Sequence, residues 1–232
     1  MADDPRVYPV EAPGWAALDR ALRRAYPGQV PHQFTSRTPY EETSRSPLPA
    51  VMAFEGNGPE HWHLVGYGCS ELFDKTSPNA SISGFGFEVG IRLPRASGEE
   101  RPPAWAVVLL QAVGHHVLFG GARLDAGHVL DLGGSLRPEP PSAQVACLCV
   151  PDPRLGKIDT PNGSVLFLSL VGLRAEERDE IASWDLPRKV YAARELAPAG
   201  ITDPDRAAWA EDPATRTVWR RYTLGVLADG PG

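Results

Sequence analysis

Two histidines flank a tryptophan in the motif His61-Trp62-His63, and this spacing could bring both imidazoles to one metal ion. Side chains two residues apart on a strand share a face, and imidazole nitrogen is a common zinc ligand. A third ligand would have to be one of the other histidines, which are His32, His115, His116 and His128. The chain has no Cys-x-x-Cys or His-Glu-x-x-His spacing to support the pair. We therefore expect no metal site and interpret both histidines as ordinary strand residues.

Carboxylates could add general acid–base chemistry to these imidazoles. The alternative hypothesis from the residues is a small metal-dependent or acid–base hydrolase that uses His61, His63, Glu71 and Glu88. Against it, the sequence has neither the Gly-x-Ser-x-Gly motif of a nucleophile elbow nor a catalytic cysteine signature. Scattered carboxylates usually face solvent. The sequence thus favours a protein that is not an enzyme.

Two further motifs could suggest a cofactor. The segment Gly84-Phe85-Gly86-Phe87 lacks the third glycine of a dinucleotide-binding motif, and no helix directly follows it. Cys147 and Cys149 share a strand face but have apolar neighbours, which predicts buried and unreactive thiols. We expect no cofactor.

A few helices around a sheet must position these residues. Apolar spacing predicts a first helix over 13–26, and short helices over 175–184 and 186–196. Strand patterns cover residues 33–37, 50–55, 60–68, 84–93, 129–132, 144–150 and 164–173. The predicted fold class is α+β, with a largely antiparallel or mixed central sheet and a few flanking helices.

The segments 84–93 and 102–119 contain most of the predicted core. In 84–93 the apolar side chains alternate with glycines and charged residues, which predicts one core face. The helix over 102–119 is apolar nearly all round, which predicts that it is largely buried. Its stripe contains Trp105, Val108, Leu109, Ala112 and His116. We expect the core between sheet and helix to contain Trp62, Phe85, Phe87 and Trp105.

Composition and charge narrow the class of protein. The chain has 232 residues, 42% hydrophobic and 22% charged, which is typical of one globular domain. Its net charge of −6 and the lack of a basic stripe disfavour nucleic acid and anionic membrane as partners. The first ten residues contain no apolar secretion signal, and the three cysteines suit a reducing compartment. These features predict a cytoplasmic protein.

Motifs in a fixed order along the chain resemble the Suppressor of Fused domain family. They are Gly14-Trp15, Glu60 to His63, Gly66 to Gly68, Ser83 to Glu88, Pro102 to Trp105, Gly127-His128, Asp152-Pro153 and Asp159 to Gly163. The similarity covers roughly residues 13–196. We expect residues 1–12 to be an N-terminal extension and 197–232 a C-terminal extension docked on the same domain. Because prolines and glycines punctuate the chain after 196, we expect that extension to be separable.

The resemblance implies a mixed α/β domain with no known catalytic activity. Animal members hold Gli transcription factors and clamp an extended peptide between two domains, of which this chain matches the first. The family signature is implied to be mainly structural, and it consists of Trp62, Gly84, Phe85, Phe87, Glu88 and Trp105.

The resemblance also places partner-binding positions at His116, Leu124 and His128. An ungapped comparison puts tyrosine, phenylalanine and aspartate there in animal members, which disfavours a Gli-type partner. Bacterial domains similar to this one are thought to be immunity proteins. We therefore predict a cytoplasmic protein-binding module, and more specifically a bacterial immunity protein that neutralises a toxin by stoichiometric binding. A structural domain without a fixed partner is the third hypothesis.

Overall fold

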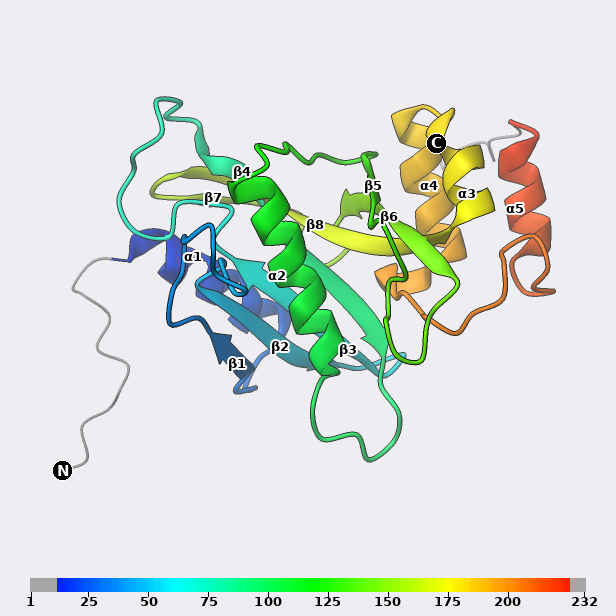
Figure 1. The fold of residues 1–232 in the computed structure, drawn as a ribbon, viewed down its shortest axis with the longest axis horizontal. Helices are drawn as coiled ribbons and strands as arrows, with labels where there is room; N and C mark the ends of the chain where they lie inside the picture. Colours follow the sequence, from blue (N-terminus) through cyan, green and yellow to red (C-terminus); the bar gives the residue numbers. More distant parts are fainter. Residues whose placement is uncertain (1–11, 226–232) are drawn as a thin grey trace.

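A computed structural model describes residues 12–225 of the protein as one mixed sheet with helices on both faces (Figure 1). Most of the predicted N-terminal extension and residues 226–232 of the C-terminal one lie outside the described residues. The strands are β1 (His32–Thr35), β2 (Ala50–Gly56), β3 (His61–Tyr67), β4 (Ile82–Pro94), β5 (Val129–Asp131), β6 (Gln144–Pro151), β7 (Lys157–Thr160) and β8 (Gly163–Arg174). The helices are α1 (Pro13–Ala25), α2 (Ala104–Leu118), α3 (Ala175–Ala182), α4 (Leu186–Leu196) and α5 (Arg216–Thr223), with a 3₁₀ turn at Pro198–Gly200. The predicted α+β fold class is confirmed.

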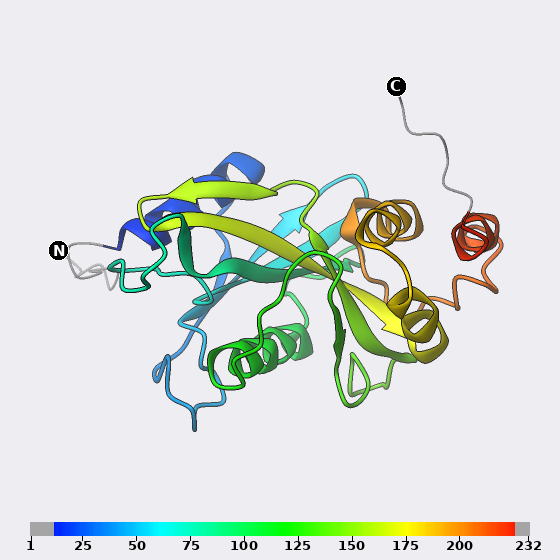
Figure 2. The same cartoon turned by 90° about the horizontal axis from the view of Figure 1, so that it is seen from above.

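The sheet has the strand order β1-β2-β3-β4-β8-β6-β5, and β7 pairs with β8 outside this path. Only the β4–β8 pairing is parallel, and the other pairings are antiparallel. In Figure 2, α1 and α2 lie on opposite faces of the sheet. One core cluster therefore forms beneath α2, a second beneath α1, and a third between the sheet and α3–α5.

Helix α2 covers the sheet with only one of its faces. Ala106, Leu110, Val113 and Val117 are buried on the inward face. Gly114 permits the close approach, because a Cβ added there would lie 2.4 Å from Leu48 Cγ. The prediction that α2 is largely buried is wrong, because its outward face is exposed. The helix is an outer layer, and Val108, Ala112 and His116 on its other face are exposed to solvent.

The predicted stripe on α2 lies on this outward face. Val108 is 66% exposed, His116 is exposed, and Trp105 is half-buried. Beneath the helix, Trp62 and Phe87 are buried in the core cluster, and Phe85 packs against its margin. The core under α2 therefore contains two of the four predicted aromatic residues, and the other two lie at its border.

The C-terminal segment packs into the third cluster. Ile201 forms a parallel β-bridge with Arg92, and Thr202 N donates to Arg92 O at 2.8 Å. Trp209, Trp219 and Tyr222 are buried against the side chains of α3 and α4. These contacts argue against the expectation that the segment after 196 is separable.

Candidate functional site

A groove lies between the outward face of α2 and the region of β5. Its volume is about 430 Å³. The lining is mostly apolar, with Trp105, Val108, Leu109, Ala112, Val113, Leu130, Leu132, Leu136 and Pro138, and its polar members are His116, Asp131 and Ser135. Apolar side chains gathered at the surface mark binding sites in soluble proteins. The arrangement is suited to binding and offers little for catalysis.

Strand β5 borders this groove and forms one edge of the sheet. It pairs with β6, and no strand of the described sheet lies beyond it. Leu132 N donates to Val145 O of the β6 side at 3.0 Å. Since backbone direction alternates along an antiparallel strand, Leu130 also faces β6. The backbone N–H and C=O groups of Val129 and Asp131 therefore face away from the sheet and are open to pairing.

The side chains of this strand also alternate. Leu130 and Leu132 pack toward the cluster beneath α2, whereas Val129 packs toward the third cluster. An added strand at this edge would place alternate side chains over the groove. The sequence predicted a strand over 129–132, but residue types alone did not show that it is an edge strand.

The three predicted partner-binding residues do not share one pocket. His116 is exposed near the C-terminus of α2 and lines the groove. Leu124 lines a separate pocket of about 240 Å³ beside Phe85 and Phe87. His128 is exposed, and its Nδ1 accepts a hydrogen bond from Asp125 N at 3.1 Å, which closes a local turn. The structure thus brings only His116 to the groove.

The histidines of the hydrolase hypothesis are buried. His63 Nδ1 lies 2.7 Å from the Tyr26 hydroxyl, and Nε2 lies 3.3 Å from Asp152 Oδ2. Burial and the adjacent Arg92 lower the pKa of His63 to about 4, so its ring is neutral at pH 7. His61 is also buried, and its Nδ1 donates to Pro59 O at 2.8 Å. Neither ring is positioned to meet a substrate.

Arg92 and Asp152 form a buried ion pair beside His63. Two guanidinium nitrogens of Arg92 donate to the two carboxylate oxygens, one of them at 2.8 Å. Oδ1 of Asp152 also accepts hydrogen bonds from Arg154 N and Leu155 N at 2.9 and 2.8 Å. Burial opposes ionisation of Asp152, but His63 and Arg92 hold its pKa well below the usual range. The motif Asp152-Pro153 therefore fixes a turn.

The carboxylates of the hydrolase hypothesis organise the loop between β3 and β4. Glu88 is fully buried and accepts hydrogen bonds from Gly68 N, Cys69 N and Ser70 N, at 3.0, 3.2 and 3.0 Å, and from the Ser70 hydroxyl. Burial raises the pKa of Glu88 to about 7, although these donors lower it. Glu88 therefore holds the loop in place through its carboxylate oxygens.

Glu71 anchors the second half of the same loop. Its carboxylate accepts from the Lys75 ammonium at 2.8 Å, from the backbone N–H groups of Thr76 and Ser77, and from Gly84 N at 3.0 Å. Burial would raise the pKa of Glu71, but these donors hold it well below the usual range. Gly84 has φ 56°, and a Cβ there would lie 2.9 Å from Cys69 O, so this position requires glycine.

The four residues of the hydrolase hypothesis lie in two separate places, with His61 and His63 in one and Glu71 and Glu88 in the other. Within residues 12–225 no hydrogen bond or ion pair joins the histidine pair to the glutamate pair. The same part of the chain contains no group of three or more histidine, cysteine, aspartate or glutamate side chains placed to hold a metal. Cys147 and Cys149 are free and buried, and burial raises the pKa of the Cys149 thiol to about 12. The geometry does not assemble the hydrolase site.

The mixed sheet, its buried polar networks and the open edge of β5 define an α+β domain with an exposed apolar groove suited to binding. A family model for Suppressor of fused protein (SUFU) matches residues 46–207. The chain belongs to the Suppressor of fused family, whose members are regulatory binding proteins with no known enzymatic activity.

Individual relatives agree with this assignment. The human and mouse Suppressor of fused homologs are each 31% identical over 184 residues, covering 74% of this chain and 38% of theirs. The chain thus spans less than half the length of these curated relatives. Drosophila Suppressor of Fused has a TM-score of 0.81 at 26% identity, covering 93% of this chain and 54% of that one.

Two further solved structures share the fold. A chain in the Sufu–Fu complex has a TM-score of 0.82 at 26% identity, covering 95% of this chain and 100% of that one. A putative SUFU homolog from Neisseria gonorrhoeae has a TM-score of 0.57 at 16% identity, covering 84% of this chain and 96% of that one, and shows the fold alone. Within residues 12–225, no helix has the length and apolar character needed to cross a membrane.

Proposed function

We propose that this protein is a non-catalytic protein-binding module that pairs an extended partner segment with the edge of β5. The observation that carries the proposal is the open backbone of Val129 and Asp131 directly beside an apolar groove of about 430 Å³. Strand addition gains main-chain hydrogen bonds from such an edge and side-chain selectivity from the adjacent groove. The Sufu–Fu complex shows that a similar domain binds a protein.

The groove defines which partner segment would fit. Val108 and Leu130 provide apolar contact area, and His116 and Asp131 are polar groups in the lining. We expect an extended segment whose alternate side chains are apolar, because one face of an added strand would lie over the groove. Gli-type segments are disfavoured, since His116, Leu124 and His128 differ from the residues expected for an animal member.

A proline substitution tests the edge without disturbing the sheet. Asp131→Pro removes an outward N–H but leaves the hydrogen bonds to β6 in place, as proline is tolerated at such edge positions. Peptides selected on the wild-type protein by display should bind Asp131→Pro at least tenfold more weakly. Asp131→Ala is the matched control, because it also loses the side-chain contacts to Gly133 and Arg178. Equal binding by Asp131→Pro and Asp131→Ala would refute pairing at β5.

A charge placed in the groove tests the apolar contacts. Val108→Asp puts a carboxylate on the outward face of α2, where the side chain is already 66% exposed and the fold is not expected to change. Val30→Asp is the matched control, because Val30 is 89% exposed and lies outside the groove. The selected peptides should lose affinity for Val108→Asp only. If both variants bind equally, the groove is not the site.

More specifically, we propose that the protein is a cytoplasmic immunity protein that neutralises a toxin by one-to-one binding. The net charge of −6 suits a basic partner, and a bacterial homolog shares the fold. Co-expression with a candidate toxin from a neighbouring gene tests this proposal. The wild-type protein should restore growth and Asp131→Pro should not. If binding occurs without restored growth, the module binds a partner but is not an immunity protein.

A further inference from the structure

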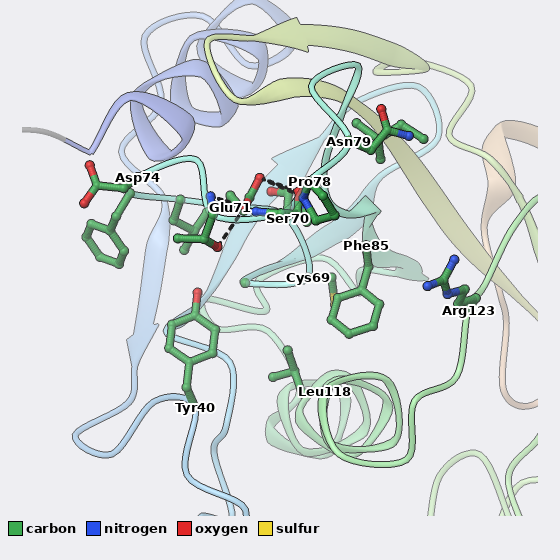
Figure 3. A pocket seen from close by; sticks show the side chains of 17 residues that line it. Tyr40, Cys69, Ser70, Glu71, Asp74, Pro78, Asn79, Phe85, Leu118 and Arg123 are labelled. Atoms are coloured by element: carbon green, nitrogen blue, oxygen red, sulfur yellow. Dashed lines mark hydrogen bonds between the residues drawn. The ribbon is translucent and has the colours of Figure 1, made fainter.

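A second and larger cavity lies at the C-terminal end of α2. Its volume is about 680 Å³, within the range of established ligand pockets. The loop between β3 and β4 forms much of its wall, and Phe85, Leu118 and Tyr40 add apolar surface (Figure 3). It shares no lining residue with the groove beside β5. The cavity is therefore a site distinct from the groove beside β5.

The wall of this cavity is fixed before any ligand arrives. Glu88 holds the backbone of residues 68–70, and Glu71 holds residues 75–77 and Gly84. A preformed site loses less conformational entropy on binding. The two glutamates that looked catalytic in the sequence instead build this wall.

Tyr40 lines the cavity in an unusual backbone conformation. Its φ is 61°, a left-handed value that is costly for a residue with a side chain. Its N–H donates to Pro47 O at 2.8 Å, which holds the turn. The side chain is 42% exposed, and its hydroxyl has no hydrogen-bond partner among the described residues. Burial, with Glu88 and Cys69 nearby, raises the pKa of Tyr40, so the hydroxyl stays a donor.

Two unpaired charges mark opposite ends of the cavity. Figure 3 shows Asp74 on the side of Tyr40 and Arg123 on the far side of Phe85. Both line the cavity, both are exposed, and neither forms a hydrogen bond or ion pair through its side chain within residues 12–225. The carboxylate of Glu71, the third charged group in the lining, is occupied by its own loop. The cavity therefore has an acidic end, an apolar middle and a basic end.

We propose that this cavity is a second recognition site for a protein partner, and that it binds, in one chain direction only, a segment that places a basic residue, an apolar residue and an acidic residue in that order in space. The basic residue lies against Asp74, the apolar side chain lies against Phe85 and Leu118, and the acidic residue lies against Arg123. Tyr40 donates a hydrogen bond to the segment backbone. The unpaired charges set the direction of the segment, since complementary charges determine orientation more than affinity.

A pair of reversed peptides tests the direction. The probes are acetyl-Lys-Ser-Phe-Ser-Glu-amide and acetyl-Glu-Ser-Phe-Ser-Lys-amide, each also prepared with one or two additional serines in each spacer. The two orders have the same composition and net charge. Titrations by NMR should show a preference of about fivefold between the orders at low salt, as expected for exposed charge pairs, and a smaller one at 0.5 M salt. The preferred order should shift the Phe85 and Leu118 signals.

Charge reversal of the protein makes the test decisive. Asp74→Lys/Arg123→Glu should invert the peptide preference, and because both positions are exposed the fold should remain. Arg101→Glu/Glu211→Lys is the matched control, since it reverses two exposed charges outside the cavity. Tyr40→Phe should weaken both peptide orders by the same few-fold factor. Absence of binding, equal binding of the two orders, or inversion by the control pair would overturn the proposal. None of these outcomes depends on β5.

Discussion

The buried polar cluster around Arg92 and the groove beside β5 contrast in the residues that they use. The cluster contains the groups that suggest chemistry, including His63 and Asp152, and each is surrounded by protein. The groove is open to solvent and is lined mainly by leucine, valine and tryptophan side chains. The residues with reactive side chains therefore stabilise the fold, and the least reactive ones form the surface that a partner could contact.

This contrast has an energetic basis. A buried ion pair gains little net stability, but removing one member leaves an uncompensated charge in the protein. An exposed apolar residue such as Val108 contributes little to folding, so its replacement has a small effect on stability. Substitutions in the cluster should change stability without changing the binding surface, and substitutions in the groove should do the reverse.

The largest expected effect comes from the third cluster. A chain ending at Leu196 would lose Trp209 and Trp219, whose truncation costs about 3–5 kcal/mol each in typical cores. It would also leave the buried carboxylate of Glu177 without Arg206. Since total stability is about 5–15 kcal/mol, we expect the shortened chain to lose its cooperative thermal transition by calorimetry.

The full-length variant Trp209→Ala provides the graded version of this test. It should retain a cooperative transition at a lower melting temperature. A sharp transition near the wild-type temperature for the chain ending at Leu196 would restore the original expectation that the extension is separable.

Breaking the Arg92–Asp152 pair should have the next largest effect. Asp152→Ala leaves a buried guanidinium unpaired, and we expect it to lower the free energy of unfolding by about 3–5 kcal/mol in urea. Adding Arg92→Met should recover part of this loss, because it removes the orphaned charge. Arg221→Ala breaks a partly exposed pair with Glu195 and should lower the free energy of unfolding much less. If Asp152→Ala is as stable as Arg221→Ala, the cluster is not a structural centre.

Two phenylalanines on β4 allow a residue in the core to be compared with one at its border. Phe87 is 2% exposed, and Phe87→Ala should cost about 3–5 kcal/mol. Phe85 is only half-buried at the margin of the cluster, so Phe85→Ala should cost clearly less. Urea unfolding of both variants measures the difference. Equal losses would mean that Phe85 is as central to the core as Phe87.

The raised pKa of Glu88 predicts that the stability of the protein depends on pH, with a smaller effect than the substitutions above. Its pKa of about 7 in the folded protein exceeds the value near 4.3 expected in the unfolded chain. The folded state therefore binds the proton more tightly, and the stability from this group is present at low pH and lost as the pH rises through 7.

Comparison with Glu88→Gln isolates this contribution, because the glutamine does not titrate. From pH 5 to pH 8, the unfolding free energy of the wild type relative to Glu88→Gln should fall by on the order of 2 kcal/mol. A difference that stays constant or grows with pH would show that the carboxyl remains ionised throughout.

Local patterns predicted much of the fold, and three-dimensional context determined the rest. The helix α1 and strands β2, β3, β4, β6 and β8 follow from apolar spacing, as expected when one face is buried. The sequence patterns predicted neither strand β7 nor helix α5. The parallel pairing of β4 with β8 joins segments far apart in sequence, which no local pattern specifies.

The groove was harder to predict for a specific reason. Helix α2 is apolar on both faces, and the sequence cannot distinguish a helix buried all round from one that exposes an apolar binding face. The resemblance singled out His116, which lines the groove, whereas Val108 and Leu130 were not recognised as surface residues. His61, His63, Glu71 and Glu88 drew attention because of their residue types, but their hydrogen-bond partners come from several strands and loops.

Residue-resolved amide hydrogen exchange tests the central claim, which is that a partner pairs with the open edge of β5. A peptide selected on the wild-type protein is added, and exchange is followed at Val129, Leu130 and Asp131. The amides of Val129 and Asp131 should become protected, because they face outward. Leu130 already faces β6 and should change little. Protection that shows no such alternation, or that appears only outside β5, would contradict the account.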